Sequence, residues 1–250
     1  MRPGGLGTAG CDGIVLAMDI MTSPNAADSA TSPKTGTSKI LYRIGGGLLI
    51  AGPILTFAGM LTAPSQAADT TAAYVESLAR DSTLTQISAL FLHYSNMTMA
   101  LGLIAAPLLI RGVRGRLLTL IGMLAAVLTM LNISGAVKDD WWRMVIGQTV
   151  PLDVAVRISD TVDAQAWLSP WRDTAMIGFL GLLLVYIGLA RAGVLGWWAP
   201  AVYVVALVGM FTVPVSLTFV YGLTFTALFA PLAVLGFLTI RRTRLPRPTV

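Results

Sequence analysis

Long apolar runs, uninterrupted by Asp, Glu, Lys or Arg except for Arg43 near the start of the first, are the feature that most constrains this chain. An α-helix needs roughly 17 to 25 apolar residues to cross a hydrocarbon core of about 30 Å, and these runs have that length. A helix also satisfies its own backbone hydrogen bonds, as a segment in lipid must do. The charged fraction is only 12%, whereas soluble domains carry about 25% charged residues. The sequence therefore predicts an all-α fold, a polytopic membrane helix bundle.

The runs predict six transmembrane helices. We place these spans at Ile40–Leu61, Leu84–Ile110, Leu117–Val137, Thr174–Ala190, Trp197–Ser216 and Leu217–Ile240. The last two share one apolar stretch, which we divide near Pro214. We do so because about 46 helical residues would span about twice the thickness of a membrane, and proline breaks helices.

The charged residues predict the orientation. Eleven basic residues lie next to one set of span ends: Lys34, Lys39, Arg43, Arg111, Arg114, Arg116, Arg191, Arg241, Arg242, Arg244 and Arg247. All nine acidic residues after position 40 lie toward the opposite side. Because positive charge stays inside, we expect both termini in the cytoplasm of a bacterium and the protein in its cytoplasmic membrane. Residues 1–39 then form a disordered cytoplasmic tail, residues 242–250 a basic cytoplasmic tail, and residues 62–83 and 138–172 extracytoplasmic segments.

Both extracytoplasmic segments have recognisable patterns. Ala72, Val75, Leu78 and Ala79 recur at helical spacing, which predicts a short amphipathic helix on the outer surface within 66–81. The second segment has tryptophans near both ends, at Trp141, Trp142, Trp167 and Trp171, and Trp197 and Trp198 lie at the other side of the membrane. Tryptophans at such positions are typical of an interfacial belt. The alternative use of the outer four is an aromatic mouth over a lipid-like ligand.

The second predicted span carries the most polar stretch of the membrane region. His93 and Asn96 are three residues apart and share a helix face. Asn132 and Ser134 lie near the outer end of the third span, so the two polar groups are expected to approach one another. Such residues mark functional sites in membranes but also form hydrogen bonds between helices, worth about 0.6 kcal/mol each. His93, Asn96, Asn132 and Ser134 are our candidate ligand-binding residues, with helix association as the alternative.

A second candidate site uses carboxyl groups at the outer rim. Asp139 and Asp140 follow the third span, and Asp173 precedes the fourth. An acid beside the aromatic faces of Trp141, Trp142 and Trp171 suits protonation of a prenyl chain, and integral membrane terpene cyclases are similar in size and apolarity. Carboxylates at this boundary are otherwise solvated markers of topology.

Other chemistries lack the residues that they need. One cysteine and one histidine, His93, provide no intramolecular disulfide, no zinc site and no bis-histidine haem, so we predict no metal and no cofactor. The stretch from His93 to Met97 is similar to a rhomboid protease motif, but no histidine follows it to activate a serine. Because the basic residues lie at span ends, we expect no nucleic acid partner.

Glycines predict close helix packing. Gly45, Gly52 and Gly59 recur every seven residues along the first span, and Gly178 and Gly181 lie in the fourth. Small residues on one face allow two membrane helices to approach closely. We therefore expect partner helices against both stripes.

Three motifs resemble those of small, uncharacterised bacterial six-helix integral membrane proteins. They are the segments 41–53 (LYRIGGGLLIAGP), 73–81 (AYVESLARD) and 111–118 (RGVRGRLL). The resemblance implies a membrane protein and no particular activity. We expect a non-catalytic accessory or lipophile-handling component of the membrane. Its partners would be the lipid bilayer and one of three others: a membrane protein partner, a second copy of the chain or a lipophilic small molecule. The alternatives are the prenyl enzyme and a transporter or export-permease subunit.

Overall fold

The computed structural model describes residues 36–110, 112–165 and 169–242. The chain divides into two units, Met1–Lys39 and Ile40–Val250, and the second contains the helix bundle. Every regular element in the described residues is helical, with no strand among them, so the all-α prediction is confirmed. The predicted tails at 1–39 and 242–250 lie almost entirely outside the described residues.

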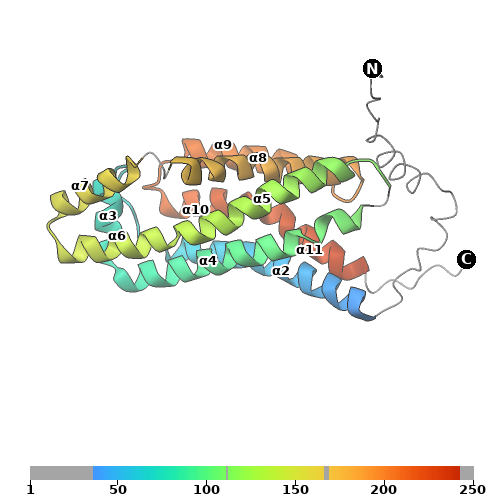
Figure 1. Cartoon of the computed structure of the whole chain (residues 1–250), viewed down its shortest axis with the longest axis horizontal. Coiled ribbons are helices and arrows are strands. Elements are labelled where there is room, and N and C mark those ends of the chain that lie inside the picture. The colour runs from blue at the N-terminus through green and yellow to red at the C-terminus, as the bar shows by residue number, and fades with distance from the viewer. Residues whose placement is uncertain (1–35, 111, 166–168, 243–250) are drawn as a thin grey trace, which may run out of the picture. The chain divides into compact units, whose positions relative to one another are not determined.

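Each predicted span contains at least one helix (Figure 1). These helices are α2 (Gly36–Thr62), α4 (Ser82–Leu103), α5 (Arg116–Ala136), α8 (Ser169–Arg191), α9 (Trp198–Thr212), α10 (Thr218–Ala227) and α11 (Ala230–Arg242). Near its end, the second predicted span changes from an α-helix to a 3-10 turn, η2 (Ala106–Leu109), which contains Pro107. The predicted break near Pro214 lies between α9 and α10, while α10 and α11 are separate helices with a bend of 41° between them.

Two of the described helices are long and apolar enough to cross a membrane by themselves. They are Lys39–Thr62 and the continuous helix Arg116–Thr149, which joins α5 to the following helix. A third span is present if the bent pair α10 and α11 counts as one. Met176–Arg191 in α8 and all of α9 are shorter apolar helices. This composition is compatible with a membrane protein.

Glycines bring α5 and α8 into close contact. A methyl group added to Gly181 would lie 2.7 Å from the backbone nitrogen of Ala126, and one on Gly122 would lie 2.6 Å from the carbonyl oxygen of Gly181. Gly115, which precedes α5, has a φ of +74°, a backbone conformation that residues other than glycine rarely adopt. The predicted packing role of Gly181 is therefore confirmed.

The glycine stripe of α2 faces α4. The nearest side-chain atoms to a methyl group added at Gly52 belong to Met99, and those at Gly59 belong to Leu92. Polar groups reinforce this contact, because Ser95 Oγ donates a hydrogen bond to Gly52 O at 2.8 Å and lies 2.5 Å from Thr56 Oγ1. The first and second predicted spans thus form a close helix pair.

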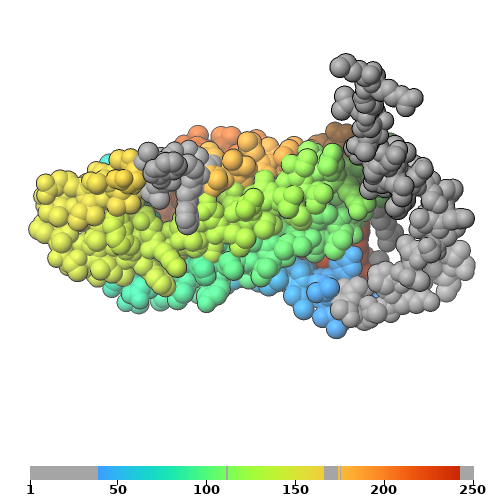
Figure 2. Space-filling view, in the orientation of Figure 1, coloured from blue at the N-terminus to red at the C-terminus, as the bar shows by residue number. Residues whose placement is uncertain are grey.

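Three further helices gather at one end of this unit, beyond α4 and α5 (Figures 1 and 2). They are α3 (Thr71–Arg80), α6 (Lys138–Thr149) and α7 (Leu152–Asp163), here called the helical cap. Thr70 caps α3 by accepting a hydrogen bond from Ala73 N. Val75 and Leu78 of α3 are buried where it packs against α6 and α7, which confirms the predicted amphipathic helix.

Candidate binding cavity and its acidic wall

Polar residues of the second and third predicted spans meet in part. His93 Nδ1 lies 2.8 Å from Ser134 Oγ and 3.1 Å from Ser134 O, which links α4 to α5. Asn96 donates a hydrogen bond to Leu92 O within α4, and Asn132 donates one to the Thr174 hydroxyl of α8. The His93–Ser134 and Asn132–Thr174 contacts match the role of joining helices, whereas the Asn96 bond stays within α4. As ligand-binding residues, the four remain a prediction.

A cavity of about 710 Å³ lies between the cap and the apolar helices. Ligand sites for small molecules commonly have volumes of about 300–1,000 Å³. Its apolar wall comes mainly from α2, α4 and α10 and the segments beside them, and its polar wall from the cap and the segment before α3. The residues that line it include Met60, Ala63, Asp69, Tyr74, Leu78, Leu92, Asp139, Asp140, Arg143, Asp163, Val215, Thr218, Tyr221 and Phe225.

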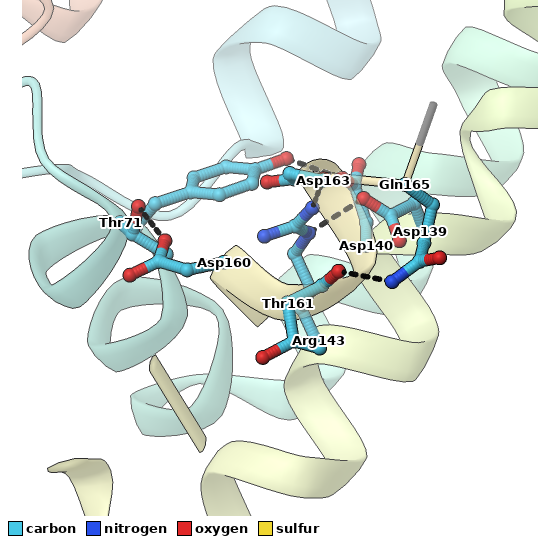
Figure 3. A network of polar contacts seen from close by, with 9 residues as sticks. Thr71, Asp139, Asp140, Arg143, Asp160, Thr161, Asp163 and Gln165 are labelled. Carbon is cyan, nitrogen blue, oxygen red and sulfur yellow. Dashed lines mark hydrogen bonds and ion pairs between the residues drawn. The ribbon is translucent and has the colours of Figure 1, made fainter. Parts of the chain in front are cut away.

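Arg143 organises the acidic wall. Its Nε donates to Asp139 Oδ2 at 2.5 Å, and its Nη2 donates to Asp163 Oδ1 at 2.7 Å. Asp139 lies one helical turn before Arg143 on α6, while Asp163 is the last residue of α7. Figure 3 shows the guanidinium directed toward both carboxylates. The side chain of Arg143 is only 7% exposed, so the two carboxylates offset the cost of removing its charge from water.

Asp140 has a different partner. The hydroxyl of Tyr74, on α3, donates a hydrogen bond to Asp140 Oδ1. Both residues belong to the cap, outside the apolar parts of the helices. Burial raises the pKa of Asp140 to about 6, the nearby Asp139 adds to the rise, and the Tyr74 bond and Arg143 oppose it. Burial, followed by the charge of Asp140, raises the pKa of Tyr74 well above its usual value. Asp140 therefore changes protonation near pH 6.

Further bonds hold the cap together. Thr71 donates a hydrogen bond to Asp160 Oδ1 at 2.9 Å, joining α3 to α7 (Figure 3). Gln148 on α6 donates to Ala79 O of α3 at 3.0 Å. Thr85 Oγ1 of α4 donates to Leu78 O at 2.9 Å, which ties α3 to an apolar helix. The polar wall is thus held in place by contacts among all three helices of the cap.

The predicted acidic site is found in part. Asp139 and Asp140 line the cavity, while Asp173 lies in α8 with a side chain outside the described set. The alternative of a tryptophan-lined pocket does not describe this cavity, whose aromatic lining consists of Tyr74, Tyr221 and Phe225. Trp141 and Trp142 of α6 are not among the lining residues, and the guanidinium carbon of Arg143 lies over the Trp142 ring, 5.9 Å from its centre.

The sequence reasoning missed Tyr74, Arg143 and Asp163. The spacing of Asp139 and Arg143, four residues apart on a helix, was a readable sign of their ion pair. The contribution of Tyr74 and Asp163 was not readable, because it depends on how α3 and α7 fold back over α6.

Within the described residues, no cluster of three or more His, Cys, Asp or Glu side chains is arranged to hold a metal ion. Comparisons with protein families, with curated proteins and with solved structures found no match to this chain.

Proposed function

We propose that the protein is a six-span protein of the bacterial cytoplasmic membrane that binds a lipophilic small molecule in the cavity beneath its cap. Both termini lie in the cytoplasm and the cap lies outside. α4 and α8 have 22 and 23 residues and are about 33 to 35 Å long, enough to cross the hydrocarbon core. The basic residues at the ends away from the cap support this orientation.

Exposed apolar side chains support the immersion of these helices in lipid. Large apolar residues are exposed on the apolar helices, among them Ile54, Leu61, Leu101, Leu128, Leu180, Val205, Phe211 and Phe219. Soluble monomers rarely expose contiguous apolar patches larger than a few hundred Å². Lipid is the solvent that such side chains prefer, so their exposure costs nothing in a bilayer.

The cavity is the observation that carries the binding function. Met60, Leu78, Leu92, Val215 and Phe225 offer apolar contact, while the acidic wall offers charge and hydrogen-bond acceptors. A molecule with an apolar body and a polar end fits such a mixed wall. The cavity also lies where the apolar helices end and the charged cap begins, which is the depth at which amphiphiles collect in a bilayer.

Native mass spectrometry after gentle extraction tests this function. We expect a small-molecule adduct on the wild-type protein that is lost in Ala63→Trp, because the indole occupies part of the cavity and blocks the ligand there. The matched control is Ala201→Trp, on the exposed surface of α9, which should keep the adduct. An adduct that survives Ala63→Trp, no adduct at all, or a stoichiometric protein partner in its place would contradict lipophile binding. The last result would indicate an accessory subunit.

One observation favours a second function, an enzyme that protonates a prenyl substrate. Asp140 lines the cavity with a pKa of about 6, so part of it is protonated near neutral pH, and Tyr74 and Phe225 provide aromatic faces in the same lining. The test is incubation with prenyl substrates. Cyclised product that requires Asp140 would support it, whereas equal product from Asp140→Asn would exclude this acid.

A further inference from the structure

We propose that the cavity takes a lipophilic amine: its protonated head binds Asp140 on the acidic wall and its apolar chain lies along α4 and α10. This inference rests on the proposed lipophile binding and adds the chemical class of the ligand. It follows from the charges, the aromatic groups and the two-sided wall of the cavity, taken together.

Negative charge remains on the wall after the internal ion pairs are formed. The charged residues among the described lining are Asp69, Asp139, Asp140, Asp163 and Arg143. Arg143 forms ion pairs with Asp139 and Asp163 at 2.5 and 2.7 Å, so its positive charge is already compensated by these two carboxylates. Asp140 accepts a hydrogen bond from the neutral hydroxyl of Tyr74, which does not compensate its negative charge. An anionic head group would therefore be repelled, while an ammonium group would gain charge-assisted hydrogen bonds.

The apolar wall supplies what an alkyl chain needs. Leu78 and Leu92 from α3 and α4 face the same cavity as Val215 and Phe225, from the segment before α10 and from α10 itself. Tyr221 and Phe225 add aromatic faces, which attract a cation within about 6 Å of the ring centre. A small hydrophilic cation would leave this half of the cavity unused, so the ligand needs a long apolar part.

Protons compete with the amine for Asp140. The titratable and charged groups that line the cavity with it are Tyr74 on α3, Asp139 and Arg143 on α6, Asp163 on α7, Asp69 before α3 and Tyr221 on α10; of these, Tyr74, Asp139 and Arg143 act on its pKa. With a pKa of about 6, Asp140 is mostly protonated at pH 5 and mostly ionised at pH 7.5. Amine binding that requires the ionised form should tighten by up to about tenfold over this range, by proton linkage.

The experiment compares three photoreactive probes with the same diazirine-bearing dodecyl chain, ending in an amine, an alcohol or a carboxylate. The full chain is placed in nanodiscs of zwitterionic lipid, and labelling of the cavity peptides is followed by mass spectrometry. We expect the amine to half-saturate at about a tenfold lower concentration than the alcohol, the gain of one charge-assisted contact. The carboxylate should label these peptides least.

Variants separate the inference from the function on which it rests. Asp140→Asn should remove both the preference for the amine and its dependence on pH, while Asp153→Asn, an exposed carboxyl on α7, should change neither. Equal labelling by amine and alcohol, with both blocked by Ala63→Trp, would refute the amine and leave lipophile binding intact. Labelling that Ala63→Trp does not block would refute both. An amine preference that survives Asp140→Asn would refute the role of Asp140.

Discussion

Replacing Arg143 with Met should loosen α7 from the rest of the cap. Arg143 is 7% exposed and bonds to Asp139 and Asp163, which are 43% and 40% exposed. Breaking a buried ion pair costs about 3 to 5 kcal/mol, but carboxylates as accessible as these recover part of it from water. We therefore expect a loss of about 2 kcal/mol, most of it in the contact between α6 and α7.

Hydrogen–deuterium exchange of the α7 peptide, residues 152–163, measures this loss directly. Because each 1.4 kcal/mol is a factor of ten, a local opening that is easier by about 2 kcal/mol should speed exchange there about 30-fold. Peptides of α2 and α9 should exchange as in the wild type. Arg143→Lys keeps the charge but has no planar guanidinium to reach two carboxylates. Its exchange rate in the α7 peptide should therefore lie between those of the wild type and Arg143→Met.

A matched control is available on α7 itself. Arg157 is 75% exposed and lies 4.0 Å from Asp153, a pair of the kind that contributes about 0 to 1 kcal/mol. Arg157→Met should leave exchange of α7 within about twofold of the wild type, since that pair lies at the weak end of this range. The reasoning is refuted if Arg143→Met also stays within that range, or if Arg157→Met opens α7 as much.

Three further predictions concern single contacts. Labelling of Asp140 by an apolar carbodiimide, which reacts with protonated carboxyls, should fall as the pH rises, with a midpoint near pH 6. Tyr74→Phe should move that midpoint to higher pH, because the hydrogen bond from Tyr74 lowers the pKa of Asp140. Gly181→Ala should destabilise the protein by about 1 to 3 kcal/mol through overpacking, seen as a lower unfolding temperature in micelles, whereas Gly47→Ala, with nothing within 4 Å, should not. Ser95→Ala should cost about 0.6 kcal/mol in the same assay, and no loss at all would mean that its bonds do not join α2 to α4.

Much of the fold could be predicted because apolar runs and glycines act locally. The six runs predicted the positions of the apolar helices to within a few residues at most ends, and Pro214 marked the break between α9 and α10. The predicted span Leu117–Val137 matches α5, but the helix does not stop where the sequence becomes charged at Lys138 and continues to Thr149. Charge ends a membrane span, but it does not end a helix.

The site was harder to predict for a physical reason. Asp139 and Asp140 were identified from their place beside an apolar run, and they do line the cavity. Tyr74 lies 66 residues from its partner Asp140, and Asp163 lies 20 residues from its partner Arg143, so only the folded cap brings these pairs together. The sequence alone identifies Asp139 and Asp140, whereas the packing of α3 and α7 on α6 brings their surroundings together into one wall of the cavity.

The central claim, that an acidic cavity lies beneath a cap on the outer face of the membrane, is tested most directly by cysteine accessibility in intact cells. Single cysteines are introduced in a Cys11→Ser background at Asp153, exposed on α7, and at Arg191, the last residue of α8. A membrane-impermeant maleimide should label the cysteine at 153 in intact cells and the one at 191 only after the membrane is opened. The reverse pattern would contradict the account, because it would place the cap and its cavity in the cytoplasm.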